Sequence, residues 1–256
     1  MNPLSGFLSL FRSAPTGGVA ALPAGRRIYA VGDIHGYPDR LDDLMGRIER
    51  DLARSRPDRT EIVFVGDYID RGPGSATVID RLARRDAPCP IVTLRGNHEA
   101  MMLDALADPD AMDHWCGSGG DATLRSYGVD VAKLHRRGGY AEARAALIER
   151  LPDPHRAFLD DTSLHYTVGR FTFVHAGLRP GVPLAGQNPD DLLWIREEFF
   201  DAADRFEGVV VHGHTPCRRP ENEPHRINVD TGVFKYGVLT CAVLEGIERR
   251  FLSTRD

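Results

Sequence analysis

Apolar runs alternate with amphipathic stretches in the first hundred residues of the chain. RRIYAVGDIHG (26–36) is typical of an apolar strand that runs into a glycine-rich turn. Leucine, methionine and isoleucine then recur at helical spacing from Pro38 to Ala53, which predicts an amphipathic helix. A strand EIVFVGD (61–67), a helix at about 75–85 and a strand PIVTLRGNHE (90–99) complete a β-α-β-α-β order. This order predicts a parallel sheet covered by helices.

The pattern changes after residue 100. From 101 to about 160, helical patterns such as AEARAALIERL alternate with the glycine-rich break GSGGDATLRSYG, and we interpret this part as a helical insertion. Beyond it, short apolar segments and turns such as DTG and FKYG predict a second layer rich in strands. Its strands are expected at Phe171–Val174, Val209–Val211, Ile227–Val229 and Gly237–Leu244.

Length and composition indicate one globular domain. The 256 residues are 42% hydrophobic and 27% charged, which is enough to bury a sizeable core. We expect a tail at 1–25 and a single domain at 26–254. The N-terminal MNPLSGFLSLFRS is too short for a signal sequence or a membrane span, so we interpret it as a frayed tail.

Charge and cysteine usage argue against several classes of protein. A net charge of -5 provides no basic field for a nucleic-acid backbone, so an anionic substrate must be attracted by local positive charge. The four cysteines form no CxxC pair, which fits neither a disulfide scaffold nor a structural zinc site. We therefore expect a cytoplasmic protein that binds neither nucleic acid nor membrane.

Polar residues flanked by glycine follow most of the predicted strands. Open α/β sheets bind ligands beyond the carboxyl ends of their strands, and these residues would lie there. Each offers an oxygen or an imidazole, with glycine beside it where the backbone turns tightly or approaches another group closely. They are Asp33 and His35 in GDIHG, Asp67 in GDYIDRG, Asn97 and His98 in GNHE, His175 in HAG, and His212 and His214 in HGHT.

The chemistry of these donors points to metal ions. Carboxylate and amide oxygens mixed with imidazoles, without thiolates, suit Mn²⁺, Fe or Zn. Six or seven ligands are too many for one tetrahedral site, and they fit a two-metal centre in which a carboxylate bridges ions about 3.5 to 4 Å apart. Asp67 is the natural bridge.

The order of these motifs resembles a known family. GD-x-HG, GD-x-x-DRG, GNHE, HAG and HGHT follow the order seen in the metal-dependent phosphoprotein phosphatases, a branch of the calcineurin-like metallophosphoesterases, over about residues 27–250. GNHEAMM, HWCGSGG and HGHTP are especially similar to the bacterial and bacteriophage lambda type of serine/threonine phosphatase. The resemblance implies an α/β fold with a two-sheet β-sandwich flanked by helices, here with the helical insertion at about 101–160.

The resemblance also implies a role for each residue. The first metal would be held by Asp33, His35 and Asp67, and the second by Asp67, Asn97, His175 and His214. His98 would protonate the leaving alkoxide, and Asp70 would pair with His98 to keep it protonated and oriented. Arg71 and Arg196 would clamp phosphate oxygens through their planar guanidinium groups, with Asn97 also beside the substrate.

The implied reaction is in-line attack of a metal-bound hydroxide on phosphorus, without a phosphoenzyme. Two divalent ions would serve as cofactors, Mn²⁺ first and Fe or Zn as alternatives. We expect the substrate to be a protein that carries phosphoserine or phosphothreonine, with phosphotyrosine as an extension of the same activity.

Two other functions stay open. Symmetrical diadenosine tetraphosphate hydrolases are similar in GDxHG and HAG, although that family usually lacks the aspartate that is Asp70 here, and other small phosphoesters are a related alternative. A non-catalytic scaffold with this fold is the second alternative, but such a protein would be expected to have lost ligands or the acid histidine. The sequence does not indicate the oligomeric state.

Several other polar or aromatic residues favour ordinary structural roles. His212 either supports a neighbouring ligand or simply ends a strand, and Asp230 in NVDTG is expected to form hydrogen bonds in a turn near the metals. Trp194 is expected to pack beneath Arg196. Five histidines without ligand spacing are interpreted as surface or packing residues: His114, His135, His155, His165 and His225.

Overall fold

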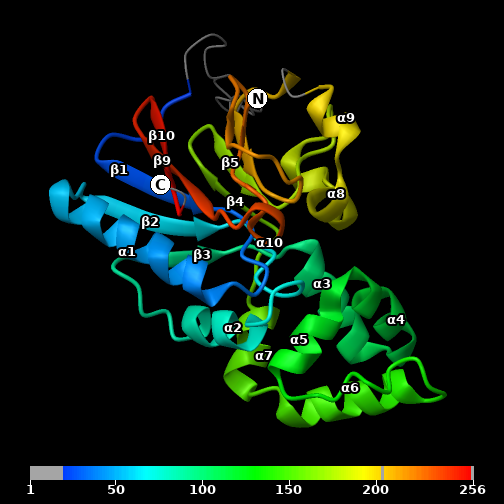
Figure 1. Ribbon diagram of the computed structural model, residues 1–256. Helices are drawn as coiled ribbons and strands as arrows, with labels where there is room; N and C mark the ends of the chain where they lie inside the picture. The colour runs from blue at the N-terminus through cyan, green and yellow to red at the C-terminus, as the bar shows by residue number, and fades with distance from the viewer. Residues whose placement is uncertain (1–19, 203–204, 255–256) are drawn as a thin grey trace, which may run out of the picture.

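Two mixed sheets face each other, and helices cover both outer faces (Figure 1). The computed structural model describes residues 20–202 and 205–254, so most of the tail predicted at 1–25 lies outside the described residues. The fold prediction of a two-sheet sandwich flanked by helices is confirmed. Within the described part of the chain, no helix combines the length and apolar composition that crossing a membrane would require.

The first sheet contains the strands predicted in the β-α-β-α-β region. Its order is β10 (Glu248–Ser253), β9 (Thr240–Glu245), β1 (Arg26–Val31), β2 (Arg59–Phe64) and β3 (Ile91–Thr93). Strands β1, β2 and β3 are parallel, whereas β9 runs antiparallel to both β1 and β10. The carboxyl ends of the three parallel strands therefore point the same way.

The second sheet is also mixed. Its order is β4 (His165–Val168), β5 (Phe171–Val174), β6 (Val209–His212), β8 (Arg226–Asn228) and β7 (Glu221–Asn222). Strands β5, β6 and β8 are parallel, and β4 and β7 pair antiparallel at the edges. Three of the four strands predicted for the β-rich layer lie in this sheet. The fourth, predicted at Gly237–Leu244, is β9 and pairs with β1 in the first sheet instead.

Alternation along the strands divides the core into layers. In β1, Ile28 and Ala30 pack between the two sheets, while Tyr29 and Val31 face the helices on the outer side. Helices α1 (Pro38–Arg54) and α2 (Ser75–Ala83) cover that side because their apolar faces have helical spacing. Strand β1 thus buries both faces, which explains its near-continuous apolar run.

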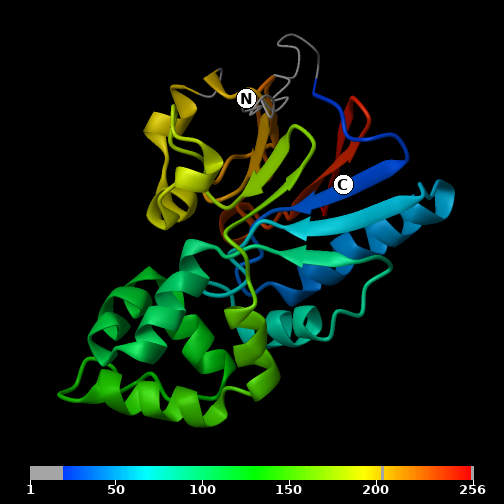
Figure 2. The same ribbon diagram turned by 180° about the vertical axis from the view of Figure 1, so that it is seen from behind.

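The second sheet is covered on its outer side by two short helices. These are α8 (Pro189–Trp194) and α9 (Glu197–Phe200), which lie on the side away from the first sheet, in yellow in Figure 2. Val210 in β6 packs against them, in a cluster that includes Leu192 and Phe199. The four layers are therefore helix, sheet, sheet, helix.

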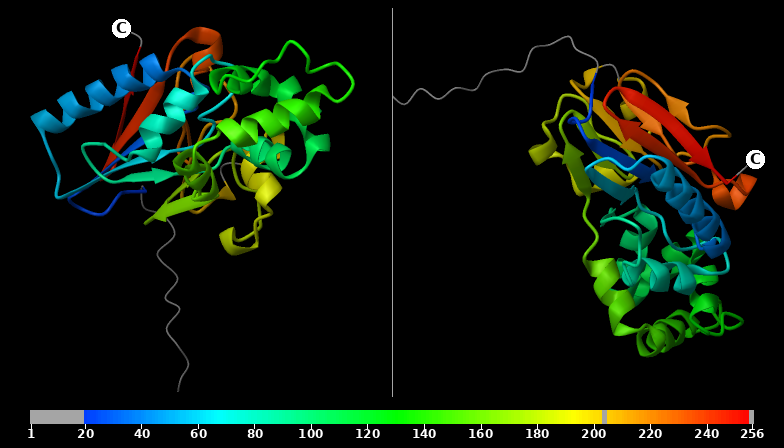
Figure 3. Two further views of the ribbon diagram at one scale, coloured as in Figure 1. Left: turned by 90° about the horizontal axis from the view of Figure 1, so that it is seen from below. Right: turned by 90° about the vertical axis from the view of Figure 1, so that its left-hand side faces the viewer.

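A group of helices, called the helical group below, fills residues 97–160 between β3 and β4. It packs next to α2 beyond the ends of the sheets, as the views in Figure 3 show in green. Its elements are α3 (Asn97–Ala107), η1 (Pro109–Ala111), α4 (Met112–Trp115), the π-helical turn η2 (Cys116–Gly120), α5 (Asp121–Ser126), α6 (Gly139–Arg150) and α7 (Asp153–Asp160).

Two local predictions are wrong. FKYG is not a turn, because Val233–Tyr236 forms one helical turn, α10, between Gly232 and Gly237, whose positive φ of 61° and 71° end it on both sides. The third strand does not reach GNHE, because Asn97 already opens α3. From the sequence pattern alone, a bend between two glycines cannot be distinguished from a single helical turn between them. The short 3-10 turn η3 (Leu184–Gly186) precedes α8.

Candidate active site

Polar residues from the carboxyl ends of both sheets meet at one place in the fold. They follow β1, β2 and β3 in the first sheet and β5, β6 and β8 in the second. All are at most 7% exposed, and they comprise Asp33, His35, Asp67, Asn97, His98, His175, His214 and Asp230. The two-sheet topology brings these residues together although they span almost 200 positions.

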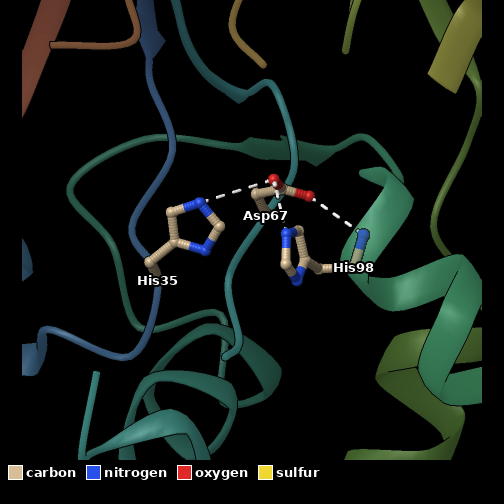
Figure 4. A group of neighbouring side chains, drawn as sticks. All are labelled: His35, Asp67 and His98. Atoms are coloured by element: carbon tan, nitrogen blue, oxygen red, sulfur yellow. Dashed lines mark hydrogen bonds and ion pairs between the residues drawn. The ribbon is translucent and has the colours of Figure 1, made fainter. Parts of the chain in front are cut away.

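Asp67 lies at the centre of this cluster. Its Oδ2 is 3.5 Å from His35 Nε2 and 3.8 Å from His98 Nε2, and its Oδ1 is 3.4 Å from His175 Nε2. Figure 4 shows His35 and His98 on two sides of the carboxylate, whose Oδ1 also accepts the backbone N–H of His98 at 3.1 Å. Two groups of possible metal ligands share Asp67: one with His35 and His98, the other with His175 and His214.

Hydrogen bonds to the backbone orient two of these imidazoles. His35 donates from Nδ1 to Ile69 O at 2.9 Å, and His175 donates from Nδ1 to Val65 O at 3.0 Å. The lone pair of each ring is therefore on Nε2, the nitrogen that faces Asp67. Burial lowers the pKa of His175 and lowers that of His35 to about 3, so both rings are neutral at pH 7, as metal ligands must be.

Asn97, His214 and Asp33 complete the second side of the cluster. Asn97 Oδ1 lies 2.9 Å from His175 Nε2 and 3.0 Å from His214 Nδ1. Asp33 Oδ2 accepts the backbone N–H of His214 at 3.1 Å, which ties the end of β1 to the end of β6. Asp33 lies beside this cluster but belongs to neither of the two ligand groups, whereas His98 does.

The buried carboxylates fit a site for cations. Asp33 Oδ1 is buried and has no hydrogen-bond partner among the described residues. Burial and the nearby charges of Asp230 and Asp67 raise the pKa of Asp33 well above its ordinary value. Uncompensated buried carboxylates are costly, and divalent cations would remove this cost by binding the free oxygens.

Two glycines leave room for the carboxylates. A Cβ on Gly96 would lie 2.1 Å from Asp67 Oδ1, and a Cβ on Gly213 would lie 2.1 Å from Asp33 Oδ1. No side chain fits at such distances. The glycines of GNHE and HGHT therefore allow backbone and carboxylate to approach closely, which is what their positions next to candidate ligands suggest.

Left-handed backbone conformations concentrate at this site. Among the described residues, six that are not glycine have positive φ, and five of them are candidate site residues. The five are His35, Asp67, Asp70, Arg71 and His214, with φ between 46° and 72°. Such conformations cost about 1–3 kcal/mol each and persist where the surrounding structure enforces them, often at active sites.

A buried carboxylate that the sequence interpretation did not assign holds this backbone. Glu99 Oε2 accepts the N–H groups of Asp67 and Gly96, each at 2.9 Å, and Oε1 accepts that of Tyr68 at 2.8 Å. Burial and the Asp67 charge raise the pKa of Glu99 to about 7. The available signal was its place in GNHE, three residues after Gly96, where a glutamate caps the start of a helix.

A second group of contacts lies beside the candidate ligand cluster, made by Asp70, His98 and Arg71. His98 donates from Nδ1 to Asp70 Oδ2 at 2.7 Å. Arg71 donates to Nε2 of His35 at 2.7 Å and to Nε2 of His98 at 3.0 Å. Its guanidinium stacks 4.2 Å from the ring of Phe234, a contact with no signal in the sequence. These residues lie together as the sequence interpretation expects, while their roles stay predictions.

Arg196 reaches the cluster from the other outer layer. Its Nε donates to His214 Nε2 at 3.1 Å. Trp194 does not simply pack beneath it: the indole is 41% exposed, meets the His214 ring edge-on at 6.0 Å, and lines an open pocket of about 290 Å³ together with Arg196. Carboxylates also line this pocket, among them Glu197 and Glu198.

Three further polar residues that the sequence analysis discusses have structural contacts, namely His212, Asp230 and His155. His212 is buried against the Phe199 ring and donates from Nδ1 to Gly213 O, and its Nε2 has no partner among the described residues. Asp230 caps a turn by accepting the N–H of Gly232 at 2.8 Å. His155 is a packing residue, 7% exposed and 2.9 Å from Tyr127 Oη.

Comparison with known proteins gives a consistent result. A family model described as calcineurin-like phosphoesterase matches residues 26–237. Serine/threonine-protein phosphatase 1 of Salmonella typhimurium is 32% identical over 225 residues, 86% of this chain and 93% of that protein. The asymmetrical bis(5'-nucleosyl)-tetraphosphatase PrpE of Halalkalibacterium halodurans is 23% identical over 240 residues, 85% of this chain and 90% of that protein.

The fold has solved counterparts as well. A crystal structure described as that of a "putative diadenosine tetraphosphatase" superposes with a TM-score of 0.61 at 23% identity, and the match covers 89% of this chain and 93% of the other. Since the family model spans most of the chain and its motifs are the ones that follow the strands of both sheets, the chain belongs to the calcineurin-like phosphoesterase family.

Proposed function

We propose that the protein is a dinuclear-metal phosphomonoester hydrolase that acts on phosphoserine or phosphothreonine in proteins, and on phosphotyrosine as an extension. The metal ligands would be Asp33, His35, Asp67, Asn97, His175 and His214. When bound, the two divalent ions, Mn²⁺ first, would neutralise phosphate charge and lower the pKa of a bound water. The observation that carries the proposal is the His98–Asp70 hydrogen bond of 2.7 Å directly beside the shared carboxylate Asp67.

The side chains of the site can bind and orient a phosphate group. Arg71 and Arg196 each donate to an imidazole of the candidate ligand cluster, Arg71 to His35 and Arg196 to His214. A phosphate oxygen would compete with the imidazoles for the Arg71 N–H groups, since charge-assisted hydrogen bonds are the stronger ones. His98 Nε2, relieved of Arg71, can then carry a proton toward the leaving group while Asp70 holds Nδ1.

The presence of a general acid favours an alcohol as the leaving group. A serine or threonine alkoxide is a strong base and leaves poorly unless it is protonated, whereas a nucleotide phosphate leaves as a weak base without this help. A buried histidine fixed by an aspartate is therefore most useful for phosphomonoesters of alcohols. The 32% identity to a protein named as a serine/threonine phosphatase supports the same substrate class.

Hydrolysis of a dinucleoside tetraphosphate is the second candidate. Relatives named as bis(5'-nucleosyl)-tetraphosphatases support it, and they are of the asymmetrical type, whereas the sequence interpretation considers the symmetrical type. The 41% exposed indole of Trp194 beside His214 offers a surface on which an adenine base could stack.

A comparison of substrates tests the proposal. The metal-free protein is reloaded with Mn²⁺ and assayed on a phosphoserine peptide, a phosphotyrosine peptide and diadenosine tetraphosphate under the same conditions. The proposal expects the highest kcat/KM on the peptides. A higher value on the dinucleotide would leave the metal centre in place and overturn the substrate, and inactivity on all three would favour the scaffold alternative.

Arg71→Ala tests the phosphate clamp. We expect the inhibition constant of inorganic phosphate to rise by about 10-fold or more, because a guanidinium hydrogen bond to a charged group contributes about 1.5–3 kcal/mol. The measurement is phosphate inhibition of p-nitrophenyl phosphate hydrolysis, with Arg125→Ala as the control, since Arg125 pairs with Asp121 on the surface of α5. Unchanged phosphate inhibition in Arg71→Ala would remove this residue from the phosphate site.

A further inference from the structure

The carboxylate of Asp70 is held by side chains of the helical group. Asp70 is fully buried and its carboxylate accepts three hydrogen bonds from side chains. One comes from His98 at 2.7 Å, and the other two come from Trp115 Nε1, at 2.9 Å to Oδ2, and from Thr123 Oγ1, at 2.6 Å to Oδ1. Trp115 and Thr123 are also fully buried. Neither residue belongs to the motifs that carry the metal ligands.

The backbone of Asp70 and Arg71 is held by the same part of the fold. Both residues have left-handed φ, 72° and 67°. The N–H of Asp70 donates to Thr123 Oγ1 at 2.9 Å and to Ser75 Oγ at 3.0 Å, and the N–H of Arg71 donates to Gly119 O at 3.2 Å. The helical group therefore supplies hydrogen-bond partners to both strained residues, and such partners are what keep a strained conformation populated.

Glycines in η2 allow it to contact Arg71 and Trp115 closely. Gly119 has φ of 112°, and a Cβ there would lie 3.0 Å from Arg71 Cγ and 3.1 Å from Arg71 N. A Cβ on Gly120 would lie 2.6 Å from the Trp115 ring. The sequence CGSGG thus omits side chains at the two points where η2 touches Arg71 and Trp115. Gly119, whose φ of 112° and ψ of 5° are not helical, kinks the chain within η2, so this segment marks a break between α4 and α5.

We propose that Trp115 and Thr123 are positioning residues, which fix Asp70 so that it orients His98 for proton donation to the leaving group. The part of the helical group from α4 to α5 then supports the general acid, and it does so through Asp70. This inference rests on the proposed function. Proton transfer requires hydrogen-bond geometry that is set within fractions of an ångström, and a carboxylate held by three donors cannot rotate away from the imidazole.

Dependence on the leaving group separates positioning from mere structural support. p-Nitrophenolate leaves without a proton, whereas a serine alkoxide needs one. A residue that acts through the general acid must therefore matter for a phosphoserine peptide and hardly for p-nitrophenyl phosphate. A residue that only stabilises the fold or the metal site lowers both rates together.

The test uses the Mn²⁺-loaded full chain with Thr123→Val, which keeps the shape of the side chain and removes its hydroxyl, and with Trp115→Phe, which removes the indole N–H. We expect kcat on the phosphoserine peptide to fall by about 10- to 100-fold and kcat on p-nitrophenyl phosphate by less than about 3-fold. Thr123→Ser should restore the peptide rate, and metal content should stay that of the unmodified protein.

Two variants serve as controls. Tyr127→Phe removes a buried hydrogen bond to His155 within the same helical group without touching Asp70. Thr60→Val removes a buried hydroxyl in β2 that has no hydrogen-bond partner among the described residues. Both controls should leave the ratio of the two rates unchanged. Equal losses on both substrates in Thr123→Val, or no loss on either, would overturn the inference.

A spectroscopic measurement keeps the inference testable by itself. In the protein loaded with diamagnetic Zn²⁺, the proton on His98 Nδ1, in a short hydrogen bond to Asp70, should give a far-downfield resonance in NMR spectra. We expect Thr123→Val to shift or broaden this resonance and Thr123→Ser to restore it. If the unmodified protein hydrolysed neither substrate, the proposed function would be wrong. Independently of that result, an unchanged resonance in Thr123→Val would contradict the positioning role of Thr123.

Discussion

Replacement of His98 by alanine should lower turnover of a phosphoserine peptide by about a hundredfold or more, the contribution typical of a general acid. Burial by itself would lower the pKa of His98, but the Asp67 charge and the hydrogen bond to Asp70 outweigh it and raise this pKa. Once a phosphate draws Arg71 away from Nε2, the ring therefore holds a proton more firmly than an ordinary histidine. Loss of this proton donor affects a substrate with a poor leaving group most strongly.

The measurement compares kcat of His98→Ala on the peptide and on p-nitrophenyl phosphate, with metal content determined for both proteins. The smaller loss is expected on p-nitrophenyl phosphate, and the metal content should be unchanged. His155→Ala is the matched control, because it removes another buried histidine that is bonded to Tyr127 and not to a site residue. Full activity of His98→Ala on both substrates would contradict the assignment of His98 as the general acid. Loss of bound metal in this variant would indicate instead that His98 is a metal ligand.

Asp67→Asn should reduce metal affinity and turnover together, each by more than about a hundredfold, a larger loss than the 10- to 100-fold typical of groups that only support a ligand. Both groups of candidate ligands share Asp67, so one change weakens both metal positions. The asparagine has the same shape and can still accept the N–H of His98. The expected effect therefore comes from the lost charge and not from a cavity.

Metal titration of the apo-protein checks this prediction, followed by calorimetry or by the shift of Tm. A ligand that binds only the folded state stabilises it by about 2.7 kcal/mol at a hundred times its Kd, so the Mn²⁺-dependent rise of Tm should disappear in Asp67→Asn. Asp43→Asn on the surface of α1 is the control. Two tightly bound ions in Asp67→Asn would contradict the shared-ligand geometry.

The sequence by itself determined the layered fold and the edge at which the candidate ligands meet. Both follow from local patterns: apolar strands that bury two faces, the helical spacing from Leu41 to Leu52, and the rule that parallel strands carry ligands at their carboxyl ends. The close contact between the glycines of GNHE and HGHT and the neighbouring carboxylates could also be predicted from the sequence, because a glycine beside a candidate ligand indicates that the backbone approaches another group closely.

Only the tertiary structure decided how the site is supported. The bonds from Trp115 and Thr123 to Asp70 join residues 45 and 53 positions apart. Phe234 under Arg71 and Arg196 beside His214 likewise depend on how distant elements pack. No local period of apolar and polar residues encodes such contacts, because they arise from the docking of the helical group and of α10 against the ends of the sheets. The chain pattern therefore determines which residues meet at the strand ends, and packing determines which partners hold them in place.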